Sequence, residues 1–269
     1  MSGAIGVEPA WVETLRSACR GGRVGDPLRF VPSLPSTNDA ARDWLAAGGP
    51  SGLAVIAGEQ TAGRGRRGRA WVSPPETGLY LSVGLVLPPA LAPYLTFVGA
   101  VAVAEALHDR GIAAEICWPN DVEVKGRKIA GVLAETRVDG GPRIHGVVGV
   151  GLNVSQREAD FPGSLGGRAT SVRLEGDDSG GPGVWAGALL TRLGRLVAEL
   201  ETSSGAALLD RWRRLSPSQH GAAVMIEGDG ESFAGVTRGI DDEGALRIER
   251  ADGRVAVVRV GELRRARRA

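Results

Sequence analysis

The chain has 269 residues, of which 43% are hydrophobic and 23% charged, the balance of an ordinary globular protein with a buried core. This length suits one large domain followed by a small one, or two modest domains. With 32 basic and 31 acidic side chains, the net charge is +1. Dedicated nucleic-acid-binding domains are usually strongly basic, so this charge argues against that class.

Cysteine and histidine are scarce and scattered. The separation of Cys19 and Cys117 fits no metal motif, and the three histidines offer no zinc spacing. So few cysteines favour a reducing interior over a secreted, disulfide-built protein. The N-terminus lacks the basic start and apolar core of a signal peptide. No apolar stretch is expected to approach the ~18 residues that a membrane span needs. We therefore expect a cytoplasmic protein without a membrane partner.

The first part of the chain predicts helices that alternate with apolar strands. A proline before it and a glycine pair after it favour a helix over 9–19, and Ser36–Asn38 can cap another helix over 39–47. The run LAVIA at 53–57 is apolar throughout, as in a strand buried on both faces. Further strands are expected over 28–32 and 79–87, and a long helix over 93–110.

The middle of the chain predicts an antiparallel meander, because Gly, Asn and Asp turns separate short apolar runs. Its strands are expected over 114–117, 122–124, 128–136 and 143–152. From Asn153 a loop is expected, and EGDDSGGPG at 175–183 has the composition of a flexible linker. Two helices are then expected over 184–200 and 206–215.

The pattern changes after Pro217. Short strands separated by GDG, DDEG and ADG turns predict a small β-barrel of roughly 50 residues. These strands are expected over 222–227, 233–240, 245–250 and 255–260. The basic C-terminal ELRRARRA is expected to be a solvated end. We therefore predict an α+β domain at 1–217, with 1–27 as a helical extension, and an all-β domain at 218–269.

The segment GEQTAGRGRRGRAW at 58–71 concentrates arginine and glycine between two apolar strands. Gly63, Gly65 and Gly68 match the dinucleotide-binding fingerprint, but the WVSPP that follows cannot begin the required helix. The Gly-Lys-Ser/Thr of a phosphate-binding Walker loop is absent. A second motif, DSGGP at 178–182, resembles a serine-protease loop, but it lies in the linker without a catalytic histidine in a matching setting.

Two interpretations of this arginine-rich loop remain. It can be a solvated charge run, as most such runs are. Its ends, however, are held at the mouth of a sheet, where binding loops commonly lie. Glycines let the backbone approach a ligand, and arginine forks suit carboxylate or phosphate. An RNA-binding role would require repeats, disorder and a basic chain, so an anionic small molecule is favoured.

Several motifs, in order along most of the chain, resemble those of biotin–protein ligases. They are STN at 36–38, the loop at 58–71, WPND at 118–121, RKIAGVLAE at 127–135, GVGLNV at 149–154 and GVTRGIDDEGAL at 235–246. The resemblance implies an α+β fold, with a mixed, largely antiparallel sheet in a catalytic domain related to the lipoate ligases. A small SH3-like C-terminal β-barrel would follow it.

The resemblance implies an ATP-dependent ligase. Such an enzyme activates biotin to biotinyl-5′-AMP, releases pyrophosphate and transfers biotin to a lysine of a biotin carboxyl carrier protein. Mg²⁺ would accompany ATP, held largely by nucleotide oxygens and waters rather than by a protein metal site. The family forms no covalent enzyme intermediate, so neither cysteine is expected to be a nucleophile. A monomer or a weak homodimer is expected.

The family's functional residues correspond to particular positions of this sequence. Lys128 and Arg66 are the expected catalytic residues. Expected contacts to biotin are Ser36, Thr37, Asn38, Gln60, Gly63, Arg64, Arg66, Lys128, Gly131 and Val132. Expected contacts to ATP or the adenylate are Arg64, Arg66, Arg67, Trp71, Lys128 and Asn153. Arg69 is expected to be structural or solvated.

Some of these residues also have simpler explanations. Ser36 and Thr37 would cap the following helix with or without a ligand. Trp71 could pack in the core instead of stacking on adenine. Lys128 alone would suit a solvated strand edge. The prediction therefore depends on whether the fold brings these side chains together.

The sequence departs from the family at one notable position. The lysine that commonly precedes WPND is Cys117 here, and we expect activity to persist because Lys128 and the loop arginines remain. A family arginine that reaches ATP corresponds to one of Arg264, Arg265, Arg267 and Arg268. Many relatives carry an N-terminal helix-turn-helix domain. Fewer than ~30 residues precede the first strand, too few for such a domain, so no operator binding is expected.

Three alternatives stay open at the level of sequence. The first is a lipoate or octanoyl ligase or transferase on the same scaffold, although those relatives lack GRGRRGR. The second is a nucleic-acid-binding module that uses the arginine-rich loop. The third is a biotin-binding protein without activity, suggested by Cys117.

Overall fold

A seven-stranded sheet forms the centre of the computed structural model, which describes all residues except 1–7, 139, 179, 228–231, 260–261 and 266–269. The strand order is β1-β2-β3-β7-β6-β5-β4. Only β1 and β2 run parallel, and every other neighbouring pair is antiparallel. The strands are β1 (Leu28–Leu34), β2 (Ala54–Gln60), β3 (Gly78–Leu87), β4 (Glu115–Cys117), β5 (Asp121–Val124), β6 (Arg127–Val138) and β7 (Ile144–Asn153).

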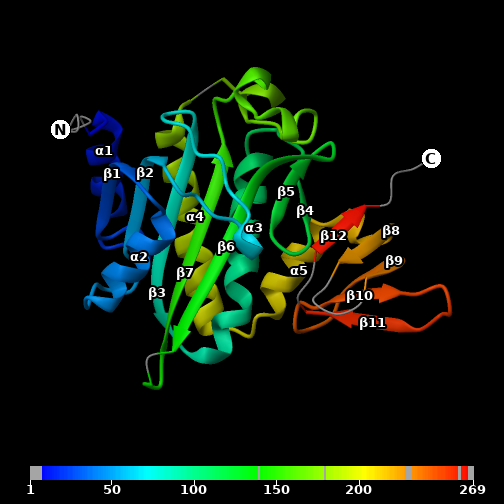
Figure 1. Cartoon of the computed structure of the whole chain (residues 1–269). Helices are drawn as coiled ribbons and strands as arrows, with labels where there is room; N and C mark the ends of the chain where they lie inside the picture. Colours follow the sequence, from blue (N-terminus) through cyan, green and yellow to red (C-terminus); the bar gives the residue numbers. More distant parts are fainter. Residues whose placement is uncertain (1–7, 139, 179, 228–231, 260–261, 266–269) are drawn as a thin grey trace.

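Helices cover both faces of this sheet (Figure 1). The long helices α3 and α4 pack on each other and on one face, whereas α2 packs on β2, β3 and β7. The α-helices are α1 (Ala10–Cys19), α2 (Thr37–Ala46), α3 (Leu95–His108), α4 (Pro182–Thr202) and α5 (Ala206–Arg214). Short 3₁₀ helices are η1 (Arg66–Gly68), η2 (Pro89–Tyr94), η3 (Glu158–Asp160), η4 (Gly163–Leu165), η5 (Arg173–Glu175) and η6 (Pro217–Gln219).

The two faces of the sheet follow the alternation of side chains along its strands. In β2, Ala54 and Ile56 belong to the main core, while Val55 packs in a smaller cluster with Ala41 and Leu45 of α2. Ala54–Ala57 are all buried, which confirms the prediction of a strand covered on both faces. The face under α2 is the one that carries the candidate site.

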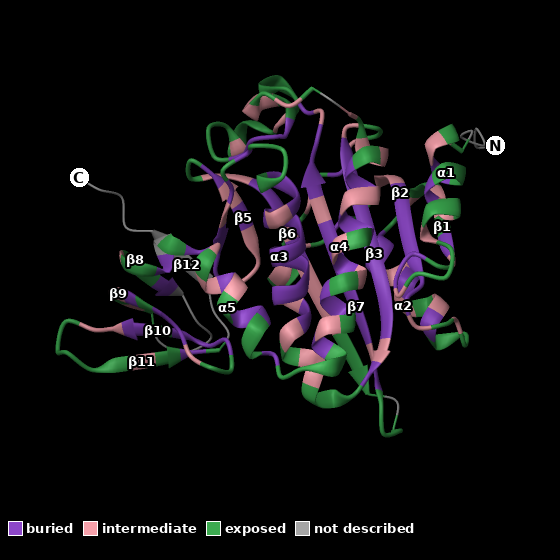
Figure 2. Ribbon diagram, turned by 180° about the vertical axis from the view of Figure 1, so that it is seen from behind, coloured by how far each residue is buried: buried purple, intermediate pink, exposed green. Residues whose placement is uncertain are grey.

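Helix α3 is the central helix of the main core (Figure 2). Together with η2 it forms a helical segment, Pro89–His108, of 20 residues with mean hydropathy 1.7, long and apolar enough to cross a membrane. The expectation that no apolar stretch approaches this length was therefore wrong. In the fold, 61% of its apolar window is buried inside the protein, where it packs on the sheet and on two other helices.

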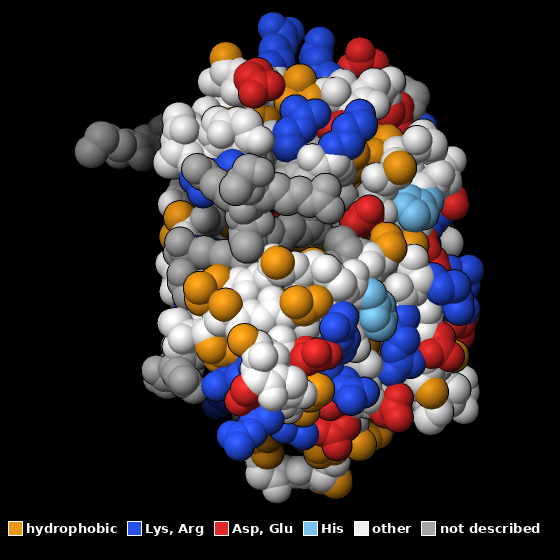
Figure 3. All heavy atoms as spheres, turned by 90° about the vertical axis from the view of Figure 1, so that its right-hand side faces the viewer, with side chains coloured by type: hydrophobic (Ala, Val, Ile, Leu, Met, Phe, Trp, Pro, Cys, Tyr) orange, Lys and Arg blue, Asp and Glu red, His pale blue; other side chains and the backbone are white. Residues whose placement is uncertain are grey.

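The C-terminal strands form a separate five-stranded antiparallel sheet in the order β11-β10-β9-β8-β12. They are β8 (His220–Glu227), β9 (Phe233–Ile240), β10 (Leu246–Glu249), β11 (Val255–Val258) and β12 (Glu262–Arg265). Basic and acidic side chains are interleaved on the face of the molecule that carries this sheet (Figure 3).

Strand β12 differs from the expected solvated tail. Its backbone pairs with β8, with Leu263 opposite Ile226. The expectation failed because a four-residue strand that gains its stability from a distant partner leaves little local pattern. Of the four arginines considered for ATP, Arg264 and Arg265 lie in β12, whereas 267 and 268 lie outside the described residues.

Helix α2 begins two residues earlier than expected, at Thr37, and its N-cap residue Ser36 makes no capping hydrogen bond. Ser36, Thr37 and Asn38 are all buried, each 4% exposed. The simpler explanation of these residues as helix caps is therefore not supported. The polar side chains at the start of α2 point toward the sheet instead.

Candidate active site

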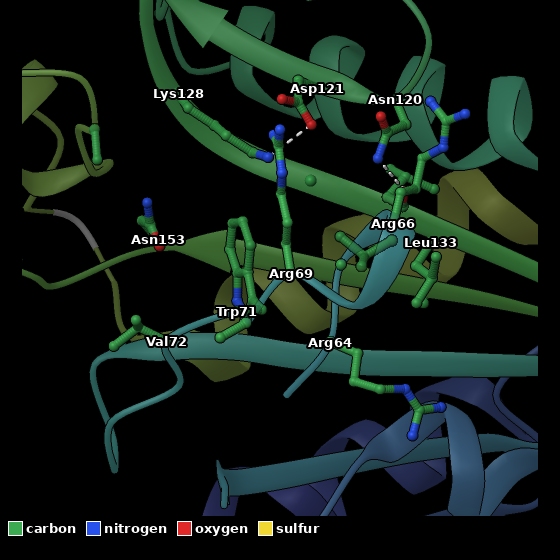
Figure 4. Close-up of a pocket in the computed structure, with 18 of the residues that line it drawn as sticks. Arg64, Arg66, Arg69, Trp71, Val72, Asn120, Asp121, Lys128, Leu133 and Asn153 are labelled. Atoms are coloured by element: carbon green, nitrogen blue, oxygen red, sulfur yellow. Dashed lines mark hydrogen bonds and ion pairs between the residues drawn. The ribbon is translucent and has the colours of Figure 1, made fainter. Parts of the chain in front are cut away.

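A cavity of about 630 Å³ opens on the α2 face of the sheet (Figure 4). Four parts of the chain line it: the start of α2, the arginine-rich loop, the WPND turn with β6 and β7, and the segment that follows β7. These parts lie far apart in the sequence. Most of the predicted site residues therefore meet in one place.

The floor of the cavity is a pair of glycines. Gly131 of β6 lies directly opposite Gly151 of β7, and the indole of Trp71 lies against both. A Cβ added at Gly151 would come within 2.5 Å of Trp71 Cε2 and Nε1, and one at Gly131 within 3.2 Å of Trp71 Cζ3. Only bare backbone lets the ring approach this closely. Trp71 thus packs on the cavity floor and not in the hydrophobic core.

Trp71 lies beside the lysine of the predicted reaction centre. Lys128 Nζ is 5.3 Å from the centroid of the indole, within the range of a cation–π contact. The indole Nε1–H is buried and has no hydrogen-bond partner within the described part of the chain. Leaving a buried donor unpaired costs free energy, and a ligand group that accepts a hydrogen bond from this N–H would remove that cost.

Lys128 is held by its side chain and by its backbone. Its Nζ pairs with Asp121 Oδ1 of the WPND turn at 2.7 Å. Its backbone N–H donates to Arg168 O, and its carbonyl accepts from the N–H of Thr170, both at 2.9 Å. These contacts clamp β6 to the segment after β7, so the ammonium group has a defined place at the cavity wall.

The same segment connects Lys128 to Asn153 at the other end of the cavity. Asn153 Nδ2 donates to Thr170 O at 2.9 Å, and Thr170 Oγ1 donates to Glu175 Oε1 at 2.7 Å. The Glu175 side chain is only 3% exposed and also pairs with Arg127 Nη2 at 2.7 Å. Burial raises the pKa of this carboxyl, but the contacts from Thr170, Lys125 and Arg127 outweigh it, so the pKa lies below its ordinary value.

A second polar network forms the end of the cavity beneath α2. Thr37 donates to Gln60 Oε1 from its backbone N–H at 2.8 Å and from Oγ1 at 3.1 Å. Gln60 Nε2 donates to Ser73 Oγ at 3.0 Å, and Ser82 Oγ contacts Thr37 Oγ1 at 2.7 Å. The side chains of this network are therefore already oriented without a ligand.

Asn38 extends this network across the sheet. Its Oδ1 contacts Ser82 Oγ at 2.6 Å, and its Nδ2 donates to Glu135 Oε2 at 2.7 Å. A Cβ added at Gly149 would lie 2.0 Å from Asn38 Oδ1, so this glycine makes room for the amide. Asn38 is fully engaged inside the protein, and the geometry assigns it to orienting the network.

The arginine-rich loop presents its arginines in different directions (Figure 4). Arg64 turns toward α2, where its guanidinium forms a two-pronged ion pair with Asp39 at 2.5 and 2.7 Å. The hydrogen bond from Arg64 holds the pKa of Asp39 below its ordinary value, against the opposing effect of burial. Arg66 and Arg69 line the cavity, and Arg69 points toward Lys128 and Asp121.

Comparison with known proteins agrees with this geometry. Residues 30–153 match the biotin/lipoate A/B protein ligase family, and residues 220–260 match the biotin protein ligase C-terminal domain. A biotin–[acetyl-CoA-carboxylase] ligase of Paracoccus denitrificans is 37% identical, over 82% of this chain and 94% of that protein. The chain belongs to the biotin–protein ligase family.

Other relatives support this membership. The bifunctional ligase/repressor BirA of Escherichia coli is 34% identical, over 89% of this chain and 74% of that protein. The solved biotin protein ligase of Aquifex aeolicus, in complex with biotin and ATP, superposes with a TM-score of 0.75. It is 28% identical and the match covers 89% of this chain and 99% of that chain. The predicted fold class is therefore confirmed.

In this ligase fold, most residues predicted for the site line the cavity. They are Ser36, Thr37, Asn38, Gln60, Arg64, Arg66, Trp71, Lys128, Gly131, Val132 and Asn153. Gly63 and Arg67 do not. Gly63 is buried behind the loop, where its carbonyl accepts from Trp71 N and a Cβ would come within 2.5 Å of Trp71 O. Arg67 is exposed with φ of 54°, at a turn that aims it elsewhere.

Two further expectations change in detail. The side chain of Val132 faces the core, where a Cβ added at Gly99 of α3 would come within 2.6 Å of its Cγ1. Val132 meets the cavity side through its backbone, which exchanges two hydrogen bonds with Asn120, at 2.9 Å from its N–H and 2.7 Å to its carbonyl. Arg69, expected to be structural or solvated, is exposed and also lines the cavity. The strand parity and the loop path that decide these positions are tertiary features.

Sequence analysis missed several residues of the ligase cavity. Asp121, Arg69, Gln156 and Arg168 line it, and Asp39 holds Arg64. A signal existed for the floor, because glycine at every second position of GVGLN leaves one strand face bare. No local signal marks Gln156 or Arg168, which reach the cavity only through the path of the segment after β7.

The charged side chains that line the cavity are mostly basic. The basic ones are Arg64, Arg66, Arg69, Lys128 and Arg168, against Asp121, Glu123 and Asp160. This excess suits anionic ligands. Across the described residues, no group of three or more His, Cys, Asp or Glu side chains is placed to hold a metal ion.

Proposed function

We propose that this protein activates biotin with ATP and transfers it to a lysine of a carrier protein. The observation that carries this conclusion is the convergence of Lys128, the loop arginines, Trp71 and Asn153 on one cavity in a member of the biotin–protein ligase family. Biotin and ATP are its substrates, and the named relatives are biotin ligases. The lipoate alternative has no such support.

The first reaction joins two anions. An oxygen of the biotin carboxylate attacks the α-phosphorus of ATP, the bond to the α–β bridging oxygen breaks, and pyrophosphate leaves. The product is biotinyl-5′-AMP, a mixed anhydride. Since negative charge concentrates on the attacked phosphate, catalysis of this kind depends on positioning and fixed cations.

Lys128 and Arg66 supply these cations in our proposal. The ammonium of Lys128 contacts the carboxylate and the α-phosphate, and its clamp to Asp121 and the backbone of Arg168 places it before the ligand arrives. Arg66 lines the same cavity and neutralises phosphate oxygens. Arg69 is a third cation at this wall, opposite the Lys128–Asp121 pair.

The biotin rings occupy the end of the cavity beneath α2. Thr37 and Gln60 present oriented polar groups to the ureido edge, and Ser36 lies beside them. The backbone of Gly131, beside Trp71 and Lys128, forms part of the wall around the fused rings. Asn38 holds the network together from within.

The adenine end lies toward Asn153. Trp71 offers a flat face for stacking, and the amide of Asn153 offers hydrogen bonds to the base. Trp71 rests on the glycine floor, which holds its ring beside Lys128. When the ligands enter, Arg64 leaves Asp39 for the ligand, and the closed loop then shields the anhydride from water.

Mg²⁺ accompanies ATP in this reaction. The residues present fit an ion that enters with the nucleotide, because carboxylates line the cavity and one of them, Asp121, lies beside Lys128. Mg²⁺ commonly takes one or two carboxylates together with phosphate oxygens and waters. When bound, it would neutralise charge on the phosphates.

The second reaction transfers the biotinyl group. The ε-amine of a carrier lysine attacks the acyl carbon, an amide forms, and AMP leaves. We propose that the partner is a biotin carboxyl carrier domain. We also propose that the ligase is cytoplasmic and has no repressor role. Two relatives named as biotin–[acetyl-CoA-carboxylase] ligases match over 94% and 88% of their own length. DNA binding that requires biotin and ATP and depends on sequence would contradict this.

One experiment tests the proposed function. The protein is incubated with ATP, Mg²⁺, labelled biotin and a biotin carrier domain, and label on the carrier is measured for wild type, Lys128→Ala and Lys125→Ala. Lys125 is the matched control, an exposed lysine (79%) just before the same strand. We expect wild type and Lys125→Ala to label the carrier and Lys128→Ala to lose at least ~100-fold in rate. No labelling by wild type would refute the proposal.

A further inference from the structure

Gln156 is a buried polar side chain that the proposed mechanism does not use. It lies three residues after β7, is 2% exposed and lines the cavity. Its Oε1 atom is buried and has no hydrogen-bond partner among the residues that the structure describes. Leaving a buried acceptor unpaired costs about 1–3 kcal/mol, so such atoms are rare unless something else satisfies them.

The backbone around Gln156 is fixed, so its side chain cannot relax by moving the loop. The Gln156 carbonyl accepts from Ser171 Oγ at 2.6 Å, and Ser171 Oγ also accepts from the N–H of Leu174 at 3.2 Å. Just before it, the N–H of Ser155 donates to Thr77 O at 2.7 Å. The backbone that carries this side chain is therefore fixed beside the cavity, which Gln156 lines.

The neighbouring amide of Asn153 is already partly committed. Its Nδ2 donates to Thr170 O at 2.9 Å inside the protein. An asparagine that reads adenine by itself uses both its oxygen and its nitrogen. The amide keeps its second N–H and its oxygen for the base, and the adenine amino group, which carries two N–H bonds, can also donate to a second acceptor. Phe161 and Leu165 also line this cavity, so a base would lie among apolar surface as well.

We propose that Gln156 Oε1 accepts a hydrogen bond from the exocyclic amino group of adenine and determines the preference of this enzyme for ATP. The inference rests on the proposed function, since it requires ATP in this cavity. Adenine presents an amino donor at this position, whereas guanine presents a carbonyl acceptor. An acceptor facing another acceptor leaves both unpaired, and guanine is rejected for that reason.

The test combines a variant that lacks the acceptor and a nucleotide that lacks the amino donor. Biotin-dependent exchange between ATP and pyrophosphate is measured with ATP and with purine riboside 5′-triphosphate, which has hydrogen in place of the amino group. Wild type should prefer ATP by about tenfold in kcat/KM, the expected effect of one buried hydrogen bond. Gln156→Met keeps the size of the side chain and removes the acceptor, so its preference should fall to about twofold or less.

Gln219 provides a matched control. It is also buried, 1% exposed, with an unpartnered Oε1, but it lies in η6 and does not line the cavity. Gln219→Met should keep the full preference for ATP. A merely structural role of Gln156 would lower kcat/KM for both nucleotides equally, and an unchanged preference in Gln156→Met would overturn the inference. Failure of wild type to catalyse any exchange would instead refute the proposed function.

Discussion

At the scale of single residues, charged groups of the cavity form ion pairs within the protein. Lys128 pairs with Asp121, and Arg64 pairs with Asp39 and lies 3.7 Å from Glu135. These pairs hold the Lys and Arg side chains in place and neutralise their charge. Because exposed ion pairs are weak, an anionic ligand can replace one of them at small cost.

The pair between Arg64 and Asp39 leads to a prediction about ligand affinity. Asp39→Asn removes the internal partner of Arg64, so the adenylate should bind more tightly, by about two- to fivefold, the range expected for an exposed pair. Binding of a non-hydrolysable adenylate analogue measured by calorimetry checks this. Asp43→Asn is the control, since Asp43 lies on the same helix and its ion pair, at 3.4 Å, is with Arg42. Weaker binding by Asp39→Asn would show that Asp39 holds Arg64 in its binding position.

The same pair has a defined pH dependence. The pKa of Asp39 is lowered from its ordinary 3.8, first by the hydrogen bond from Arg64 and also by Arg42. A lowered pKa in the folded state means that the carboxylate contributes stability above pH 3.8, and this contribution is lost as pH falls through the lowered pKa. At neutral pH the pair is therefore intact. The difference in the free energy of unfolding between Asp39→Asn and wild type should disappear only in strong acid.

At the scale of elements, β7 assigns one of its faces to the site by the alternation of its side chains. Val147 packs under α2, Gly149 faces Asn38, Gly151 faces Trp71, and Asn153 reaches the cavity. The sequence GVGLN contains this alternation, so the bare face could be predicted. The element that lies on it could not, because Trp71 is brought there by a loop from the other side of β3.

The glycine floor yields a prediction at this scale. Gly151→Ala places a Cβ within 2.5 Å of the indole of Trp71, so the ring and the loop attached to it must move. Crowding of this kind costs about 1–3 kcal/mol, and we expect KM for ATP to rise by about tenfold or more. The measurement is steady-state pyrophosphate exchange.

Gly141→Ala serves as the control for this substitution. Gly141 lies in the connection between β6 and β7, and a Cβ there meets no atom within 4 Å. Its kinetics should match those of wild type. If Gly151→Ala kept a normal KM for ATP, Trp71 would not depend on the bare floor for its function.

At the scale of the whole molecule, the C-terminal sheet contacts the catalytic part next to the WPND turn. Trp118 Nε1 donates to Gly244 O at 3.2 Å, and Gly244 lies against Phe97 of α3. Trp118 itself lines the cavity and is followed by Asn120 and Asp121 of the same turn. The C-terminal unit therefore supports the turn that holds Lys128.

This contact predicts that damage at the junction reaches the active site. Gly244→Ala puts a Cβ 2.4 Å from Phe97 Cζ, at φ of +84°, and should lower both Tm and adenylation. Gly253→Ala is matched, because Gly253 has φ of +81° and an open surrounding. Both variants pay about 1 kcal/mol for the backbone conformation. Thermal unfolding and exchange activity should show a larger loss in Gly244→Ala, and equal losses would contradict the coupling.

Most of the helices and strands, and the resemblance to the family, could be predicted from the chain alone, and most of the residues predicted for the site line one cavity. Apolar runs, turn residues and the motifs around Lys128 and Asn153 are local patterns, and local patterns survive in a single sequence. The same motifs led to Gly63, which does not line the cavity, and to Val132, whose side chain faces the core.

Only the tertiary structure decided which side chains face the cavity. Strand parity turned Val132 toward the core, the turn at Arg67 aimed that side chain elsewhere, and the loop path brought Arg69 to the cavity. The pairing of Arg64 with Asp39 and the burial of Gln156 depend on segments distant in the sequence. Such contacts arise from packing, which places side chains by the shape of the whole fold and leaves no local pattern in the chain.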